Sequence, residues 1–203
     1  MDRKQHWDSV YATKAETEVS WFQDNPGISL GLIAQAGLAR EAAVIDIGGG
    51  ASRLADALLE LGYSHITVLD IAAAALEKSQ ARLGPKAAQI AWLVADITQW
   101  QPPQTYALWH DRAVFHFLTE AADRAAYKRA LLAGTQADSH VVIASFAPDG
   151  PERCSGLPVR RYSPQSLQAE LGSDFRLENS RQDEHRTPGG NIQRFQFSRF
   201  IRL

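Results

Sequence analysis

Three aspartates, Asp46, Asp70 and Asp96, are the residues of this chain best placed to do chemistry together. Each stands at or near the end of a continuous apolar run, and such runs predict buried parallel strands. Ligands of open α/β sheets bind beyond the carboxyl ends of the strands, where all three side chains would point. A single aspartate after a strand is as often a helix N-cap or a turn former, so the prediction of one shared ligand rests on all three.

A glycine turn follows the first of these runs and opens into a predicted helix. Residues 46–50 read Asp-Ile-Gly-Gly-Gly. Glycine allows positive φ and lets a ligand approach bare backbone at a helix N-terminus. The third glycine of a dinucleotide fingerprint is missing, because Arg53 takes its place. The motif alone leaves open a tight turn that binds nothing.

The position of each carboxylate indicates which part of a nucleoside ligand it would meet. A carboxylate at the end of a second strand, such as Asp70, can accept hydrogen bonds from both hydroxyls of a ribose. Asp96, after the third run, is suited to an adenine amino group. Asp46 is poorly suited to a pyrophosphate and better suited to a ligand that carries positive charge.

Strand and helix patterns alternate along most of the chain, which predicts an α/β fold. Strands are predicted over 44–47, 66–70, 91–95, 106–110 and 140–146. Helices are predicted over 52–61, 72–83, 120–133 and 163–171. Residues 175–186 and 192–202 predict an antiparallel hairpin at the sheet edge. We therefore expect a doubly wound, mostly parallel seven-stranded sheet with one antiparallel strand from the C-terminal hairpin.

On these residues the chain resembles the class I S-adenosylmethionine-dependent methyltransferases. The resemblance is carried by Val44 to Leu54, Val68-Leu69-Asp70 and Ala95-Asp96-Ile97, and it covers residues 40–203. It implies a Rossmann-like methyltransferase fold and S-adenosylmethionine as the cofactor. The cofactor-binding residues that it implies are Asp46, Gly48, Gly49, Gly50, Asp70, Ile71, Asp96, Ile97 and His110.

Within that class, residues 109–118 look like the segment after the fourth strand in a bacterial branch related to eukaryotic protein-lysine methyltransferases. Those enzymes usually carry Asp-Lys-Gly-Thr where this chain has Asp111-Arg112-Ala113-Val114. The departure leaves the cofactor unaffected and the methyl acceptor open. The acceptor is expected to be an N, O or S nucleophile of a small molecule, with a protein lysine as the alternative.

Asp111 and His116 are the candidates for catalysis beside the methyl group. Methyl transfer from a sulfonium is an in-line displacement, so the protein mainly positions the reactants, and a base is needed only for a protonated nucleophile. Asp111 can orient or deprotonate an amine, and His116 can act as a base near neutral pH. The alternatives are that Asp111 caps the next helix and that His116 is a packed ring.

The first 39 residues are expected to form a helical cap over the core of residues 40–203. They are rich in aromatic residues, which disordered tails lack. Tyr11, Trp21 and Phe22 are predicted to form a lid over cofactor and substrate, with Arg112 also on the substrate side. Packing of this segment onto the sheet edge is the alternative.

Composition sets the remaining limits. The 203 residues suffice for a single domain, and a net charge of −2 gives no reason to expect nucleic acid as a partner. The only cysteine, Cys154, cannot form an intrachain disulfide, and no metal site is expected. No signal-peptide or membrane-spanning run is visible, so we expect a cytoplasmic protein. An NAD-type oxidoreductase is disfavoured by Arg53 and the terminal hairpin, and a non-catalytic binding domain by the intact ligand positions.

Overall fold

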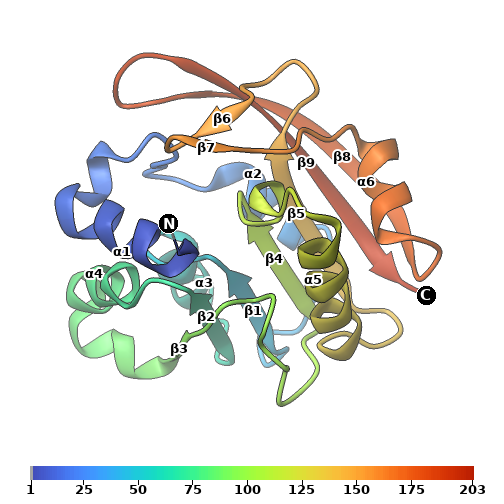
Figure 1. Ribbon diagram of the computed structural model, residues 1–203. Helices are drawn as coiled ribbons and strands as arrows, with labels where there is room; N and C mark the ends of the chain where they lie inside the picture. The colour runs from blue at the N-terminus through green and yellow to red at the C-terminus, as the bar shows by residue number, and fades with distance from the viewer. Residues whose placement is uncertain (1) are drawn as a thin grey trace.

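The computed structural model describes residues 2–203, which form a seven-stranded sheet with helices on both faces (Figure 1). The strand order is β3-β2-β1-β4-β5-β9-β8. Strands β1 to β5 are parallel, and β9 runs antiparallel to both β5 and β8. This confirms the predicted mostly parallel sheet with one antiparallel strand. The strands of the large sheet are β1 (Val44–Ile47), β2 (Ile66–Asp70), β3 (Ile90–Val94), β4 (Leu108–Arg112), β5 (His140–Phe146), β8 (Phe175–Arg186) and β9 (Ile192–Arg202).

The helices divide between the two faces because successive strand residues point to opposite sides. Val44 packs in a cluster with α2 and α3, whereas its neighbour Ile45 packs in a cluster with α5 and α6. The α-helices are α1 (Arg3–Thr13), α2 (Gly27–Ala34), α3 (Leu54–Glu60), α4 (Ala73–Leu83), α5 (Ala121–Ala133) and α6 (Pro164–Leu171). The short 3-10 helices are η1 (Glu16–Glu18), η2 (Gly84–Gln89) and η3 (Phe115–Phe117).

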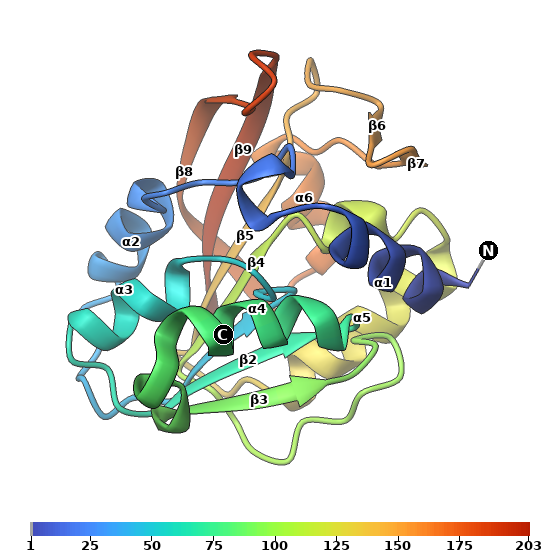
Figure 2. The same cartoon turned by 90° about the vertical axis from the view of Figure 1, so that its left-hand side faces the viewer.

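Helix α1 lies beside α4, near the edge of the sheet where β2 and β3 end (Figure 2). Tyr11 is buried in a small cluster that includes Ala51, Ala72 and Ala75, and Trp7 and Trp21 pack against this cluster. The aromatic residues of the first 25 positions therefore fix α1 over the glycine turn.

Strand β4 differs from its predicted range of 106–110. Its pairing with β1 starts at Val44 and Leu108 and continues to Ile47 and Asp111. Arg112 then pairs with Ala144 of β5, so the strand runs two residues further than its apolar run. The error arose because Asp111 and Arg112 read as loop residues, although both are inside the ladder.

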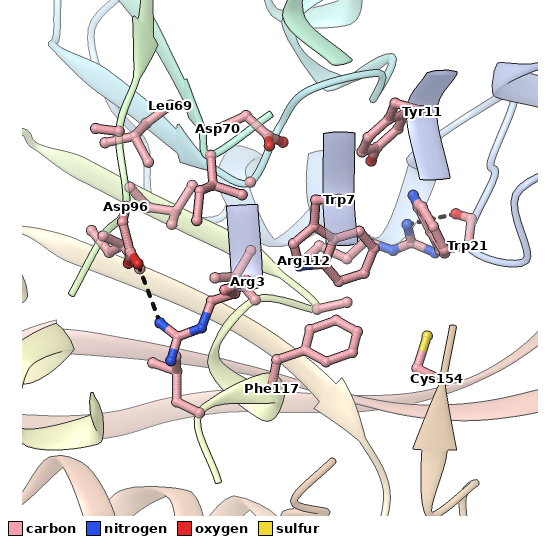
Figure 3. Close-up of a pocket in the computed structure, with 18 of the residues that line it drawn as sticks. Arg3, Trp7, Tyr11, Trp21, Leu69, Asp70, Asp96, Arg112, Phe117 and Cys154 are labelled. Carbon is pink, nitrogen blue, oxygen red and sulfur yellow. Dashed lines mark hydrogen bonds and ion pairs between the residues drawn. The ribbon is translucent and has the colours of Figure 1, made fainter. Parts of the chain in front are cut away.

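The segment after β5 contains a small two-stranded sheet that the sequence pattern did not indicate. Strands β6 (Arg153–Cys154) and β7 (Leu157–Pro158) are antiparallel and joined through Ser155 and Gly156, both at positive φ. This sheet brings Cys154 to the same region as the N-terminal aromatic residues (Figure 3).

Candidate active site

The glycine turn holds the carboxylate of Asp70 in place. The backbone N–H of Gly50 donates to Asp70 Oδ2 at 3.0 Å, and that of Ala72 donates to Oδ1 at 2.9 Å. Burial raises the pKa of Asp70 to about 6, against the opposing effect of these two hydrogen bonds. The turn and the end of β2 thus form one unit that directs a carboxylate toward a cavity.

The turn has no room for side chains at its glycines. A Cβ on Gly50 would lie 2.4 Å from Asp70 Oδ2 and 2.6 Å from Ala75 Cβ. Gly48 has φ +66, and a Cβ there would meet Val114 at 2.1 Å. The sequence therefore requires glycine here both for conformation and for close approach.

Replacing Gly50 with alanine is expected to destabilise the protein by about 2 kcal/mol, because the new methyl group overpacks the contact with Asp70 and Ala75. Chemical denaturation measures this change. Gly31→Ala is the matched control: a Cβ there meets nothing within 4 Å, and alanine in the interior of α2 should stabilise the protein by about 0.5–1 kcal/mol. Equal losses in the two variants would contradict the steric account.

Two buried hydrogen bonds in series, through His110 to Ser29, hold the side chain of Asp46 in place. His110 Nδ1 lies 2.6 Å from Asp46 Oδ1, and His110 Nε2 lies 2.9 Å from Ser29 Oγ on α2. The three residues are at most 2% exposed. The order of contacts is that of a Ser–His–Asp triad. Ser29 is only 1% exposed and therefore out of reach of a substrate, so these hydrogen bonds serve to orient Asp46.

Asp96, after β3, links the core to the N-terminal helix. Its Oδ1 accepts from the backbone N–H and the hydroxyl of Thr98 at 2.8 and 2.7 Å. Its Oδ2 lies 3.4 Å from Arg3 Nη1, and Arg3 Nη2 donates to Asp123 on α5 at 2.5 Å. Arg3 therefore fastens the start of α1 to the strand end predicted to meet adenine.

The far end of the cap is fastened by a second ionic contact. Glu16, in η1, accepts from Arg53 Nη2 at 2.9 Å and also from Arg82 of α4. Arg82 in turn donates to both oxygens of Asp56 on α3. The cap is thus tied at both ends to helices and strand ends of the core.

We expect Glu16→Gln to open the cap without unfolding the core, because it removes the charge shared by Arg53 and Arg82. Limited proteolysis within residues 14–25 should become at least about 3-fold faster, since local opening governs cleavage. Glu18→Gln removes the same charge from an exposed position of the same segment and serves as the control. Equal cleavage rates in the two variants would show that the Glu16 contacts do not hold the cap.

A cavity runs from the ends of β2 and β3 to the aromatic residues of the cap (Figure 3). Its two ends differ in chemistry. One end presents Asp70 and Asp96 beside apolar side chains that include Leu69, Ile71 and Ile97. The other end is formed by Trp7, Trp21, Arg112, Phe117, Cys154 and Phe195. Gly48 and Tyr11 also line it.

The cavity is closed over by α1. Its volume is about 90 Å³, below the roughly 300–1,000 Å³ of typical ligand pockets. The ring centroids of Trp7 lie 5.0 Å from Phe117 and 5.7 Å from Trp21, both edge-on. These contacts close the aromatic end.

A second, smaller cavity lies beside the glycine turn and shares Tyr11, Trp21, Gly48 and Arg112 with the first. Asp46, His110 and Gly49 line it, as does Phe22 of the cap. Together the two cavities bring most of the predicted cofactor and lid residues to one place.

Asp111 and His116 line neither cavity. The Asp111 carboxylate is fully buried and accepts from the Tyr127 hydroxyl at 2.7 Å and from the backbone of Val114 and Phe115. His116 is also fully buried, and burial lowers its pKa to about 3, so it is neutral near pH 7. Our prediction of catalytic roles for these two residues receives no support from their placement.

The sequence reasoning missed several residues of the cavity. Arg3 read as part of a polar tail, and Phe195 as one residue of an edge hairpin. Trp7 lies in the aromatic-rich first 39 residues but was not among the predicted lid residues. The alternating pattern of the hairpin was the one available signal for Phe195. That pattern indicates a buried side chain, but it does not point to a ligand. Residues 2–203 hold no cluster of three side chains suited to a metal ion.

Part of the chain matches a known protein family. Residues 44–133, from β1 to the end of α5, match a family described as a methyltransferase domain. This match covers less than half of the 203 residues, and it agrees with the resemblance that the strand ends and the glycine turn carry. The glycine turn and the buried acceptor atom Asp46 Oδ2, which no group in residues 2–203 satisfies, fit the S-adenosylmethionine that such a domain would bind. No curated protein matches the sequence.

Solved structures show the same fold over the whole chain. A SAM-dependent methyltransferase from Anabaena variabilis is 13% identical, with 100% of this chain and 96% of that one covered and a TM-score of 0.77. The Burkholderia thailandensis 1,6-didemethyltoxoflavin-N1-methyltransferase, solved with its acceptor and S-adenosylhomocysteine, is 18% identical, with 98% and 84% covered and a TM-score of 0.70. The glycopeptide N-methyltransferase MtfA, solved with sinefungin, is 14% identical, with 91% and 96% covered and a TM-score of 0.68.

None of the helices in residues 2–203 combines the length and apolar character needed to cross a membrane.

Proposed function

We propose that the protein transfers a methyl group from S-adenosylmethionine to an N, O or S nucleophile of a small molecule. The observation that carries this proposal is the cavity under α1, with acids at one end and aromatic side chains at the other. S-Adenosylmethionine, when bound, supplies an activated methyl group. In the proposal Asp70 holds the ribose, Asp96 the adenine, and the turn Gly48–Gly50 lies against the methionine part.

The flanking apolar residues complete the proposed cofactor site. Ile71 and Ile97 line the cavity beside the two acids, which suits the faces of an adenine ring. His110 contributes by orienting Asp46 rather than by direct reach, because its two ring nitrogens are engaged by Asp46 and Ser29. Residues 2–39 act as the lid over the core of residues 40–203.

A small acceptor fits the aromatic end better than a lysine side chain does. Trp7 and Trp21, together with Phe117, close this end under α1, and no carboxylate lines it to receive an ammonium group. A protein-lysine enzyme needs an open channel for an extended peptide. The acceptors named for two structural neighbours, 1,6-didemethyltoxoflavin and a glycopeptide, also differ from a protein lysine.

The aromatic end offers no general base. Burial raises the pKa of Tyr11 and of Cys154, so both stay protonated near neutral pH, and Arg112 is a cation. The proposal therefore favours an acceptor atom that is neutral and nucleophilic before methylation. Its bond to the methyl carbon forms as the sulfur–methyl bond breaks, and any proton on that atom leaves afterwards to water.

The test uses S-adenosylmethionine labelled in its methyl group, incubated with the enzyme and two fractions of a bacterial extract. The proposal expects label in the low-molecular-mass fraction and none above background in acid-precipitated protein. Label in protein, released as methyl-lysine on hydrolysis, would favour the lysine alternative. Failure of S-adenosylhomocysteine to bind in calorimetry would remove the proposal altogether.

A further inference from the structure

Two buried charged groups of opposite sign face the smaller cavity without partners. Within residues 2–203, Asp46 Oδ2 accepts no hydrogen bond, and Arg112 Nε and Nη2 donate none. Both residues line this cavity beside the glycine turn. Among the described residues, the guanidinium of Arg112 has one hydrogen bond, from Nη1 to the Trp21 carbonyl at 2.8 Å, and its Cζ lies 5.1 Å from the Phe195 ring centroid.

The unpartnered edge of Arg112 has the geometry of a carboxylate receptor. Nε and Nη2 form one side of the guanidinium fork, which binds a carboxylate through two parallel hydrogen bonds. Arg82 of the same protein uses this edge in that way: its Nε and Nη2 donate to the two oxygens of Asp56 at 2.9 and 2.8 Å. In Arg112 the same two nitrogens have no hydrogen-bond partner in residues 2–203, and the residue lines both cavities.

An unpaired buried cation is costly, which makes this arrangement informative. Burial lowers the pKa of Arg112 to about 10, so the group remains charged near pH 7. No carboxylate of residues 2–203 forms an ion pair with it. Arg53, Arg199 and Arg202 each have one buried nitrogen without a hydrogen-bond partner, Nε, whereas Arg112 has two, Nε and Nη2, which form one edge of its guanidinium. A carboxylate supplied by a ligand would compensate this charge.

Asp46 is the complementary group for a cation. His110 engages Oδ1 and fixes the rotamer, which leaves Oδ2 beside Gly49, where a Cβ would lie only 2.3 Å away. The bare backbone of the turn lets a ligand group come near this oxygen. Arg112, which can bind an anion, and Asp46, which can bind a cation, thus line the same cavity. This cavity shares lining residues with the larger one that contains Asp70.

We propose that Arg112 binds the α-carboxylate of S-adenosylmethionine, beside Asp46, which the family resemblance already assigns to the cofactor. The α-ammonium donates to Asp46 Oδ2, and the α-carboxylate accepts from Arg112 Nε and Nη2. This assigns Arg112, which the sequence placed on the substrate side, to the cofactor. The inference rests on the proposed function, because it takes the bound nucleoside to be this cofactor.

The experiment compares two ligands that differ only at the amino-acid end. S-Adenosylhomocysteine carries the ammonium and carboxylate, whereas 5′-methylthioadenosine is a nucleoside thioether that lacks both. Calorimetry is run on the wild-type protein, on Arg112→Gln and on Arg112→Lys. Arg161→Gln is the control, because Arg161 pairs with the exposed Glu152 in a loop outside both cavities.

The proposal expects Arg112→Gln to weaken S-adenosylhomocysteine at least 30-fold, while the affinity for 5′-methylthioadenosine stays within 2-fold. Arg112→Lys keeps the charge but not the two-donor fork, and it should weaken the affinity for S-adenosylhomocysteine at least 5-fold. This variant replaces Arg112→Gln in the test if the glutamine variant does not fold. Thermal unfolding of Arg112→Gln without ligand should occur at or above the wild-type temperature, since an uncompensated buried charge is removed.

Three results would overturn the inference. Unchanged S-adenosylhomocysteine affinity in both Arg112 variants would mean that the cofactor carboxylate does not bind Arg112. If these variants also raised the KM for the acceptor, Arg112 would be assigned to acceptor binding. Equal losses for both ligands would indicate a structural role. Wild-type protein that binds neither ligand would sink the proposed function itself, which separates the two failures.

Discussion

Replacing Asp70 with asparagine is expected to weaken the binding of S-adenosylhomocysteine at least 10-fold, which is more than 1 kcal/mol. The ribose hydroxyls would donate to a buried charged acceptor, and such hydrogen bonds are worth roughly 1.5–3 kcal/mol. Asparagine keeps one acceptor oxygen, so one of the two hydrogen bonds from the N–H groups of Gly50 and Ala72 is retained and the fold should survive. Unchanged affinity in calorimetry would count against the ribose assignment.

The same carboxylate predicts a pH dependence. Burial raises the pKa of Asp70 to about 6, and donation from ribose hydroxyls favours its ionised form. Binding must therefore release a proton when the pH lies below this value. Affinity should be constant above about pH 7 and fall roughly 10-fold by pH 5. Asp70→Asn should lack this dependence, and a wild-type profile that rises toward pH 5 would contradict the sign.

The second large effect is expected at Asp111, and it concerns stability. Asp111→Ala removes the acceptor for the Tyr127 hydroxyl and for the N–H groups of Val114 and Phe115. Leaving buried donors unsatisfied costs about 1–3 kcal/mol each, so we expect a loss of about 3 kcal/mol and a Tm lower by roughly 6–12 °C. Thermal unfolding measures this loss, and Tyr127→Phe should cost less because it removes only one of the donors.

Activity separates this structural role from the catalytic one that the sequence suggested. Methyl transfer per folded molecule of Asp111→Ala should stay within about 3-fold of the wild-type rate. A loss of 100-fold or more with normal affinity for S-adenosylhomocysteine would be in the range of general acid–base catalysis and would restore Asp111 as a catalytic residue.

Stability of the unliganded protein should also respond to pH through these two carboxyl groups. Burial raises the pKa of both Asp70 and Asp111 from 3.8 to about 6, so the folded state binds more protons than the unfolded state in that range. Their contribution to the free energy of unfolding is therefore fully present below about pH 4 and is lost as the pH rises through 6. Denaturation of wild type and Asp70→Asn across this range checks the slope.

Local signals were sufficient for the fold because each strand and helix carried its own pattern. Continuous apolar runs marked the buried parallel strands, and the glycine turn marked the start of the site. The exceptions were the small sheet of β6 and β7, which no pattern indicated, and β4, which ends in two polar residues, the buried Asp111 and the half-buried Arg112. A hydropathy pattern cannot show a hydrogen bond to Tyr127 or a cavity beside Phe195.

The candidate site divides in the same way. Asp46, Asp70 and Asp96 follow from their places at strand ends, since topology alone brings such ends together. The lid contacts do not, because Arg3 and Glu16 gain their roles from ion pairs with Asp96 and Arg82, which lie 93 and 66 residues away. Ion pairs between charged residues far apart in the chain produce no hydropathy pattern that a single sequence could reveal.

A crystal structure with bound S-adenosylhomocysteine tests the central claim most directly. The account predicts the ribose hydroxyls on Asp70, the adenine beside Asp96, and the sulfur facing Trp21 and Phe117, with Arg3 moved away from Asp96. Ligand density elsewhere on the molecule, or a cavity still filled by Trp7 and Arg3 at saturating ligand, would contradict it.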